Sequence, residues 1–288
     1  MTQSTTQPVL FGTHFHRPVT VAFDQPDSSS DGGAVLLKAV DKNPSLTGRL
    51  EKTIRDSRQP GKVIHRNLDL LRQRIYDIAA GYPDCNDADS LAKDPIHKLL
   101  LDRDPMDGQD LGSQPTLSRF ENSVTSKDLF AMAESLADIV VEHHACRLKN
   151  RARRITIDLD PTDDPTHGAQ QLSFFNAHYH YFCYLPMIGT MQFNSENEKY
   201  LFAAVLRPGN AHSSRGAIGI LSRIIPRVRA AFPKARIRVR LDGGFSSPDI
   251  LDYLDDEGVE YIVGYASNCV LVSKAKKVMG MMRALSMI

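Results

Sequence analysis

The heptapeptide RITIDLD, Arg154–Asp160, marks the point at which the repeat of apolar residues along the chain changes. Ile155, Ile157 and Leu159 alternate with polar residues, which is the pattern of a strand with one apolar face. Upstream, in Val63–Ala80, apolar side chains recur every three or four positions, as on one face of a helix. The pattern therefore predicts a mainly helical region over residues 1–150 and a sheet-containing region over residues 151–288.

Downstream of this strand, the chain alternates between strand-like and helix-like segments. We predict strands at Tyr179–Ile188, Tyr200–Leu206, Arg236–Asp242 and Val259–Tyr265, and helices at Ser214–Phe232 and Pro248–Asp256. Three strands with short connections favour an antiparallel meander, whereas strands joined through helices favour parallel pairing. A mixed α/β sheet of this order, with flanking helices, is the plan of the ribonuclease-H-like fold.

The composition is that of an ordinary globular protein. Apolar residues make up 42% of the 288 residues and charged residues 24%, which excludes a disordered chain. The formal net charge of +1 excludes a uniformly basic nucleic-acid coat. The four cysteines are widely spaced, so we expect neither a disulfide framework nor a zinc site. We find no signal peptide and no apolar run near the roughly 18 residues of a membrane span, and we expect a cytoplasmic protein.

Three aspartates form a candidate metal site. Asp158 and Asp160 lie on the polar face of the first predicted strand, and Asp242 ends the fourth. In a sheet of the predicted order these two strands are neighbours, so the carboxylates should converge at one edge. Carboxylate oxygens suit Mg²⁺, and two such ions about 4 Å apart can promote phosphoryl transfer. The alternative is that these aspartates are ordinary turn residues, since Asp242 is followed by two glycines.

A basic segment precedes Asp242. Lys199–Leu241 contains ten basic residues and no acidic one. Such a local excess can form a phosphate-binding face, although a solvated helix face is the alternative. The arginines that we expect to bind DNA are Arg215, Arg223, Arg227, Arg229, Arg236, Arg238 and Arg240.

Histidines suggest a rival site of metallohydrolase type. His178 and His180 would share one strand face, and His143 and His144 are adjacent. The signal is weak because no third histidine has ligand spacing. The motifs of phosphate-loop, dinucleotide-binding and serine-hydrolase proteins are absent from the sequence.

Six strings, in the same order, resemble the DDE-type transposases of bacterial insertion sequences, most closely the insertion sequence 1380 family. They are SSDGGAVLL (29–37), LLRQRIYDIAAGYPDCNDADSLAKDP (70–95), LGSQPTLSRFEN (111–122), IDLDPTDDPTHGAQQLSFFNAHYHYFCYLP (157–186), LRPGNAHSS (206–214) and VRLDGGFSSPDILDYLDDEGVEYIVG (239–264).

This resemblance implies a ribonuclease-H-like core that carries two aspartates and a glutamate. The first aspartate would be Asp160, because Asp160-Pro-Thr162 fits an Asp-x-Thr pattern, with Asp158 as a close alternative. The second would be Asp242. The resemblance further implies Mg²⁺ or Mn²⁺ as cofactor and strand cleavage and transfer as the reaction. The implied partners are double-stranded DNA, at element ends and target, and a second copy of the chain. It also implies a DNA-binding role for the helical region and a nucleoid location in a bacterium.

The third carboxylate of that pattern is not found. Tyr261–Ile288 contains no aspartate or glutamate, and the family glutamate would lie on a helix after the last core strand. Glu257 and Glu260 follow Asp242 by only 15 and 18 residues, before or within the fifth predicted strand. The sequence therefore predicts a C-terminally truncated, inactive transposase. The alternatives are a non-catalytic DNA-binding remnant and a metal-dependent nuclease of the same fold.

Overall fold

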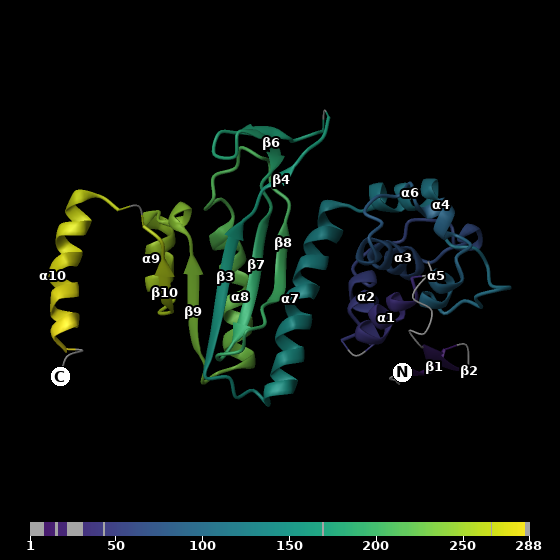
Figure 1. Ribbon diagram of the computed structural model, residues 1–288, viewed down its shortest axis with the longest axis horizontal. Helices are drawn as coiled ribbons and strands as arrows, with labels where there is room; N and C mark the ends of the chain where they lie inside the picture. Colours follow the sequence, from purple (N-terminus) through teal and green to yellow (C-terminus); the bar gives the residue numbers. More distant parts are fainter. Residues whose placement is uncertain are drawn as a thin grey trace, which may run out of the picture. The chain divides into compact units, whose positions relative to one another are not determined.

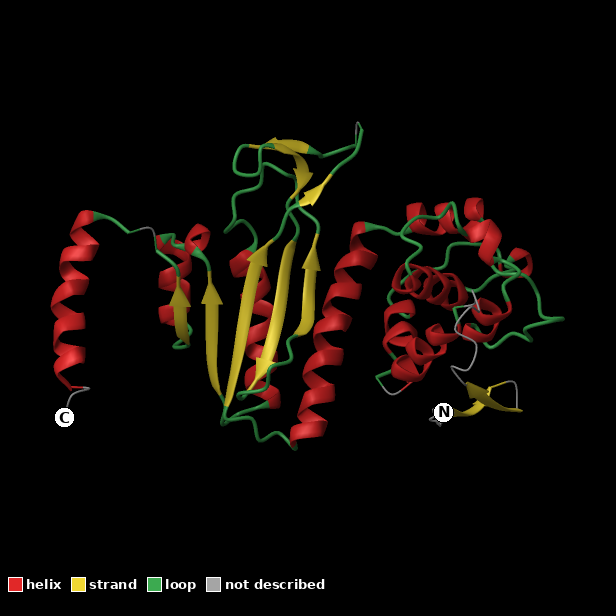
Figure 2. Cartoon of the chain, in the orientation of Figure 1, coloured by secondary structure: helices red, strands yellow, loops and turns green. Residues whose placement is uncertain are grey.

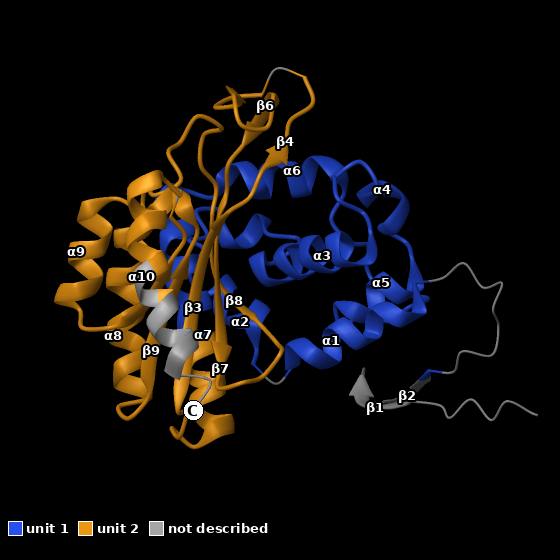
Figure 3. Ribbon diagram, turned by 60° about the vertical axis from the view of Figure 1, so that its left-hand side comes forward, with its two compact units in different colours: residues 1–139 blue, residues 140–288 orange. Residues whose placement is uncertain are grey.

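The computed structural model describes residues 9–14, 17–21, 31–42, 44–168, 170–265 and 267–285 (Figure 1). The chain forms two compact units. Unit 1 comprises residues 1–139 and unit 2 residues 140–288 (Figure 3). The division falls inside the long helix α7, Ser126–Leu148. Ile139 of this helix packs in a core cluster of unit 1, whereas His144 stacks on Phe193 of unit 2. The repeat of apolar residues in the sequence changes near the end of α7. In the structure, the side chains of α7 change from packing in unit 1 to packing in unit 2 within the helix itself.

The described part of unit 1 is mainly helical and includes an antiparallel strand pair (Figure 2). Its helix α3 ends at Gly81, whose left-handed φ of 102° turns the chain so that the N–H of Tyr82 donates back to the carbonyl of Asp77 at 2.9 Å. The elements before α7 are β1 (Val9–His14), β2 (Arg17–Val21), η1 (Gly32–Ala34), α1 (Val35–Lys42), α2 (Leu46–Glu51), η2 (Pro60–Lys62), α3 (Asn67–Ala80), α4 (Ala88–Leu91), α5 (Pro95–Leu100) and α6 (Gln114–Ser123).

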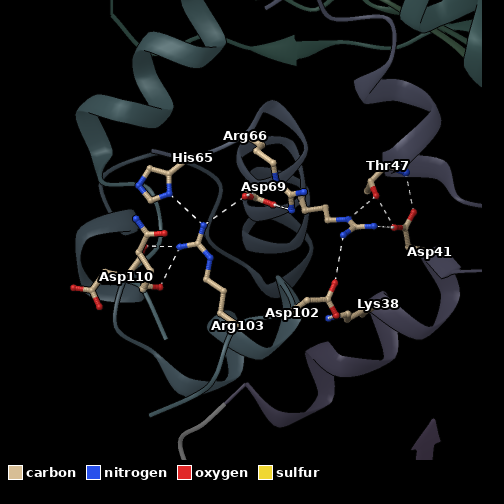
Figure 4. Close-up of polar contacts among 11 residues, drawn as sticks. Lys38, Asp41, Thr47, His65, Arg66, Asp69, Asp102, Arg103 and Asp110 are labelled. Carbon is tan, nitrogen blue, oxygen red and sulfur yellow. Dashed lines mark hydrogen bonds and ion pairs between the residues drawn. The ribbon is translucent and has the colours of Figure 1, made fainter. Parts of the chain in front are cut away.

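Polar side chains join the helices of unit 1 (Figure 4). Thr47 at the start of α2 donates its hydroxyl to Asp41 of α1 at 2.5 Å. Arg72 of α3 donates to the Thr47 hydroxyl at 3.0 Å and pairs with Asp102 at 3.6 Å. Asp102 also accepts from Lys38 of α1 at 2.6 Å. Because buried polar groups need partners, these contacts fix how α1, α2 and α3 pack.

Unit 2 is built on a five-stranded sheet in the order β10-β9-β3-β7-β8. Strands β3, β7 and β8 form an antiparallel meander, and β3, β9 and β10 run parallel. The α/β class, the ribonuclease-H-like order and the predicted neighbourhood of the first and fourth strands are confirmed. The elements are β3 (Arg154–Pro161), β7 (Met187–Phe193), β8 (Tyr200–Val205), α8 (Ala217–Ala231), β9 (Arg236–Leu241), η3 (Gly243–Phe245), α9 (Pro248–Asp256), β10 (Glu260–Val263) and α10 (Cys269–Leu285).

The predicted strand Tyr179–Ile188 is wrong. Residues 177–180 form a turn, and a separate three-stranded sheet in the order β4-β6-β5 precedes the second meander strand. Its strands are β4 (Asp164–Pro165), β5 (Phe174–Asn176) and β6 (Tyr181–Tyr184). The true strand β7 lacks an apolar signal at Gly189, where an added Cβ would lie 2.8 Å from the Phe202 ring. At Gly189, β7 therefore needs a residue without a side chain so that it can pack closely against β8, and the sequence shows no apolar residue there.

The sheet buries the faces that the sequence predicts to be apolar. Ile155, Ile157 and Leu159 of β3 are at most 2% exposed. Alternate residues of β9 and one side of α8 are also buried. No helix within the described ranges is long and apolar enough to span a membrane.

Candidate active site

The parallel pair β3–β9 brings two carboxylates to the same end of the sheet. Asp158 pairs in register with Arg240, and Leu159 with Leu241, so Asp160 and Asp242 come next on neighbouring strands. Both residues are exposed. Partial burial and then the Asp242 carboxylate raise the pKa of Asp160, which places these two charges within electrostatic range. The strand pairing therefore creates an acidic edge open to solvent.

Asp158 lies on the same face of β3 but is held by two cations. Arg240 donates to its oxygens from Nε at 2.6 Å and from Nη2 at 2.5 Å, and Lys199 Nζ lies 3.0 Å away. Burial favours the neutral acid, but hydrogen bonds from Arg240 and Lys199 outweigh it and lower the pKa of Asp158. Both oxygens of this carboxylate are thus engaged within the fold.

Asp242 begins the short turn of helix η3. Its Oδ1 accepts the Gly244 N–H at 2.8 Å, and its Oδ2 has no hydrogen bond to any other described residue. At Gly244 an added Cβ would lie 2.6 Å from the Cβ of Ser213. The loop before α8 therefore packs tightly against the turn that carries Asp242.

Arg207 braces that loop from inside. Its side chain is buried and donates to the carbonyl of Leu185 at 2.8 Å and to those of His212, Ser213 and Arg215 at 2.9–3.2 Å. Burial and the nearby Arg215 lower the pKa of Arg207. Its Nη2 has no hydrogen-bond partner among the described residues. In the sequence, Arg207 stands out only as one of the ten basic residues of Lys199–Leu241.

The two carboxylates fit a hard divalent cation. Mg²⁺ in proteins commonly takes one or two carboxylates and completes its shell with water and substrate phosphate. Within the described ranges, no group of three or more histidine, cysteine, aspartate or glutamate side chains could hold a metal. Asp160 and Asp242 could offer oxygen ligands to a divalent cation as a set of two carboxylates.

Neither nearby glutamate reaches this edge. Glu260 lies in register with Arg238, four positions before Asp242, which corresponds to about 13 Å along the strand. Arg238 pairs with it at 2.9 Å. Glu257 is ion-paired with Arg229. Both glutamates thus have structural partners away from the acidic edge.

Comparison with protein families identifies the family of this chain. The family model described as transposase DDE domain group 1 matches residues 11–286. The chain belongs to this family. No curated protein matches the chain. A solved structure, "Mos1 transposase paired-end complex with left transposon end", matches at 14% identity and a TM-score of 0.25, over 72% of this chain and 61% of that one. This DDE-domain chain thus spans about three-fifths of the length of that solved chain.

In this DDE domain, most of the seven predicted DNA-binding arginines have acidic neighbours. Arg229 pairs with Glu257, Arg236 and Arg238 pair with Glu260, and Arg240 pairs with Asp158. Arg223 and Arg227 lie on α8, and Arg215 is exposed in the turn before it. The segment that is free of acids along the sequence therefore meets acids from β3, α9 and β10 in space.

Two aromatic or histidine features differ from the sequence analysis. His178 and His180 lie in the turn before β6, so they do not share a strand face. Tyr179, which the sequence analysis did not single out, lies in the same turn. Burial, and then the charges of Asp163, Asp160 and Asp242, raise the pKa of Tyr179. The turn thus brings a phenol into electrostatic range of the acidic edge.

Proposed function

We propose that this chain is part of an insertion-sequence transposase of the insertion sequence 1380 family, which cleaves and joins double-stranded DNA by metal-dependent phosphoryl transfer. The observation that carries the proposal is the parallel pairing of β3 with β9, which brings Asp160 and Asp242 to one sheet edge in a chain of the DDE family. We place its action at element ends and target DNA, as a homodimer in the bacterial nucleoid.

Asp160 and Asp242 would hold Mg²⁺ or Mn²⁺. The bound ion supplies charge stabilisation to the phosphoryl group and its leaving oxygen. Asp160 is preferred over Asp158 because Arg240 and Lys199 engage both oxygens of Asp158. Asp158 would instead position these two cations beside the edge. Tyr179 would donate a hydrogen bond to substrate phosphate there.

The arginines of α8 and β9, with Arg215, would contact the DNA backbone. Exposed guanidinium groups bind phosphates even when a carboxylate lies nearby, because the ion pair can be shared. Neutralisation by Asp158, Glu257 and Glu260 means that the contribution of this face is smaller than the sequence suggests.

We further propose that this chain by itself binds DNA and cleaves it poorly. Asp160 and Asp242 can recruit one ion, but a second ion needs another carboxylate, and Glu257 and Glu260 are ion-paired elsewhere. Each 1.4 kcal/mol of lost transition-state stabilisation is about a factor of ten in rate. This ion pairing is also the observation that favours the second candidate, a DNA-binding protein without catalytic activity.

The test combines metal binding with strand cleavage. We expect Asp160→Ala and Asp242→Ala each to weaken Mn²⁺ binding at least roughly tenfold in calorimetric titration, because each removes a direct oxygen ligand. Asp249→Ala, at an exposed aspartate of α9, is the matched control and should bind Mn²⁺ normally.

Cleavage of DNA that carries the element ends, measured with Mn²⁺, separates the two candidates. Slow cleavage that disappears in Asp242→Ala supports the transposase, and DNA binding without any cleavage supports the non-catalytic protein. Equal Mn²⁺ affinity in all three variants would refute the metal site.

A further inference from the structure

A cavity of about 250 Å³ lies within unit 1, between the segment after α2 and helix α6. Three arginines line it: Arg55 and Arg58 from the segment, and Arg119 from α6. Its apolar wall is made by Leu70 and Phe120, which belong to the core of the unit. The cavity thus has an apolar wall from the core of the unit and three exposed guanidinium groups.

Arg58 forms a fixed wall. It donates to Asp56 from Nε at 2.8 Å and from Nη2 at 2.7 Å, and it also bonds to the His65 carbonyl and to Asn67 Oδ1. Hydrogen bonds from Arg58 lower the pKa of Asp56 to about 2, so this carboxylate stays ionised near neutral pH. The Arg58–Asp56 pair therefore adds no net charge to the cavity.

The remaining charge comes from Arg55 and Arg119. Asp128, whose pKa is lowered mainly by hydrogen bonds from Thr125, also lies within electrostatic range of Arg55. Arg119 has no ion pair within the part of unit 1 that the structure describes, and it is exposed. With Asp128 included, the surroundings of the cavity carry a formal charge of +1. This charge matches one phosphodiester.

The neutral groups of the cavity also suit an anion. Ser57 and Thr116 line it with hydroxyl groups, which donate to phosphate oxygens as readily as to carbonyls, whereas the Ser123 hydroxyl donates to the Phe120 carbonyl at 2.7 Å. The volume equals that of about eight water molecules in the liquid, so a phosphate and part of its sugar fit. Thr116, Arg119 and Phe120 all come from the string LGSQPTLSRFEN, which the acidic edge of unit 2 does not use.

We propose that this cavity binds one backbone phosphate of double-stranded DNA. The proposal rests on the proposed function in that the ligand is DNA. A phosphate held there would set the position of the helical unit on the duplex without reading its sequence, because backbone contacts carry no base information. Arg119 supplies the unpaired charge, and Arg58 and the hydroxyl groups hold the oxygens in place.

The test measures how DNA binding by the full chain depends on salt concentration. Fluorescence anisotropy gives the affinity for two duplexes of unrelated sequence. We expect Arg119→Ala to weaken binding to both duplexes alike and to make the slope of log affinity against log salt shallower by about 0.9, the value for one phosphate contact. Arg119→Lys keeps the charge and should restore the slope.

Arg66→Ala is the matched control, because Arg66 is an exposed arginine of unit 1 that pairs with Asp69 and does not line the cavity. Its slope should equal that of the parent chain. Thermal unfolding of each variant checks that the fold is intact. An unchanged slope for Arg119→Ala would overturn the inference and leave the proposed function standing. A parent chain that binds no DNA at all would overturn both.

Inorganic phosphate distinguishes the source of the ligand. Titration followed by NMR should show weak phosphate binding that Arg119→Ala removes, and added phosphate should compete with DNA. Phosphate binding without any change in the DNA slope would mean a site for a free anion and would also overturn the inference.

Discussion

Asp158 and Asp160 occupy the same face of β3, yet their surroundings are opposite. Arg240 and Lys199 surround the Asp158 carboxylate. In contrast, the neighbouring charge with the largest effect on the pKa of Asp160 is another carboxylate, Asp242. Strand alternation places both aspartates on the polar face but cannot separate their roles. The partner that separates them, Arg240, is 82 residues away in sequence. The alternation of residues along one strand shows which side chains share a face. It does not show their partners on the next strand, because these depend on the register of the sheet.

This difference predicts a stability effect at the residue scale. Asp158→Asn leaves Arg240 and Lys199 without their shared carboxylate, and the side chain of Asp158 is only 14% exposed. We expect a loss of about 1–2 kcal/mol in the free energy of unfolding, between the values for exposed and buried pairs. Urea unfolding would measure it. Asp249→Asn, at an exposed aspartate, should change stability by less than about 0.5 kcal/mol. Equal effects in the two variants would contradict the ion-pair assignment.

At the scale of elements, the small sheet β4-β6-β5 is the part of unit 2 that the sequence did not predict. Its aromatic run Tyr179–Tyr184 reads as a continuation of the following strand, because turns at residues 177–180 contain no glycine or proline. The left-handed φ of 64° at His180 makes this turn, and histidine, although it adopts this conformation more often than most residues, is a weaker turn signal than glycine or proline. Among the main strands, β3 and β9 were predictable from strict alternation and β10 from the flanking Gly258 and Gly264, whereas β7 was misplaced.

Gly209, in the segment after β8, packs closely against this small sheet. A Cβ at position 209 would lie 2.0 Å from the carbonyl oxygen of Cys183 and 2.7 Å from that of Phe174, and both of these are backbone atoms. We expect Gly209→Ala to cost about 1–3 kcal/mol, measured by thermal or urea unfolding. Gly219→Ala is the control, since this helical position has only an ordinary contact at 3.6 Å and alanine favours helices by up to about 1 kcal/mol. Similar destabilisation of both variants would show that the contact at Gly209 is relaxed in solution.

At the scale of the whole molecule, the described residues include one buried histidine in each unit, and the pKa values of the two shift in opposite directions. His97 in unit 1 lies between Asp77 at 2.9 Å and Asp31 at 3.0 Å. Burial lowers the pKa of His97, but hydrogen bonds to Asp77 and Asp31 outweigh it, and the net shift is upward. Asp94 adds to the upward shift, and the ring of Tyr82 packs edge-on against His97.

His144 in unit 2 is neutral in the fold. It packs between Phe193 and Tyr200 at ring separations of 4.2 and 4.0 Å, and its Nδ1 accepts from Arg147 Nε at 3.0 Å. Burial, and then the charge of Arg147, lower the pKa of His144 to about 4, with smaller effects from His143 and Glu196. A proton on this ring would have to displace the Arg147 hydrogen bond.

The two shifts predict separate pH windows for the two units. The stabilisation from His97 is complete below the ordinary histidine pKa of 6.5 and is lost as the pH rises through its higher folded value. The stabilisation from a neutral His144 is present above 6.5 and is lost as the pH falls from there through about 4, by roughly 1–2 kcal/mol after allowance for solvent screening. Acid should therefore weaken unit 2, and alkali unit 1.

Urea unfolding at about pH 5, 6.5 and 9, with each unit followed by pulsed hydrogen exchange and mass spectrometry, would measure these windows. His144→Phe keeps the ring packing and should remove the acid sensitivity of unit 2. His97→Asn should remove the alkaline sensitivity of unit 1. A common pH response in both units, unaffected by either substitution, would contradict the assignment.

The β3–β9 pairing also has a consequence for how the protein is made on the ribosome. Asp158 and Arg240 are 82 residues apart, and synthesis adds about 5–20 residues per second, so β9 follows β3 by about 4–16 s. During that time the nascent chain can form the β3-β7-β8 meander, but the future β9 side of β3 is an open strand edge. Open edges pair readily with other chains. Slow or stalled translation between these strands would therefore yield aggregates, and the acidic edge would assemble only in chains that pass Asp242.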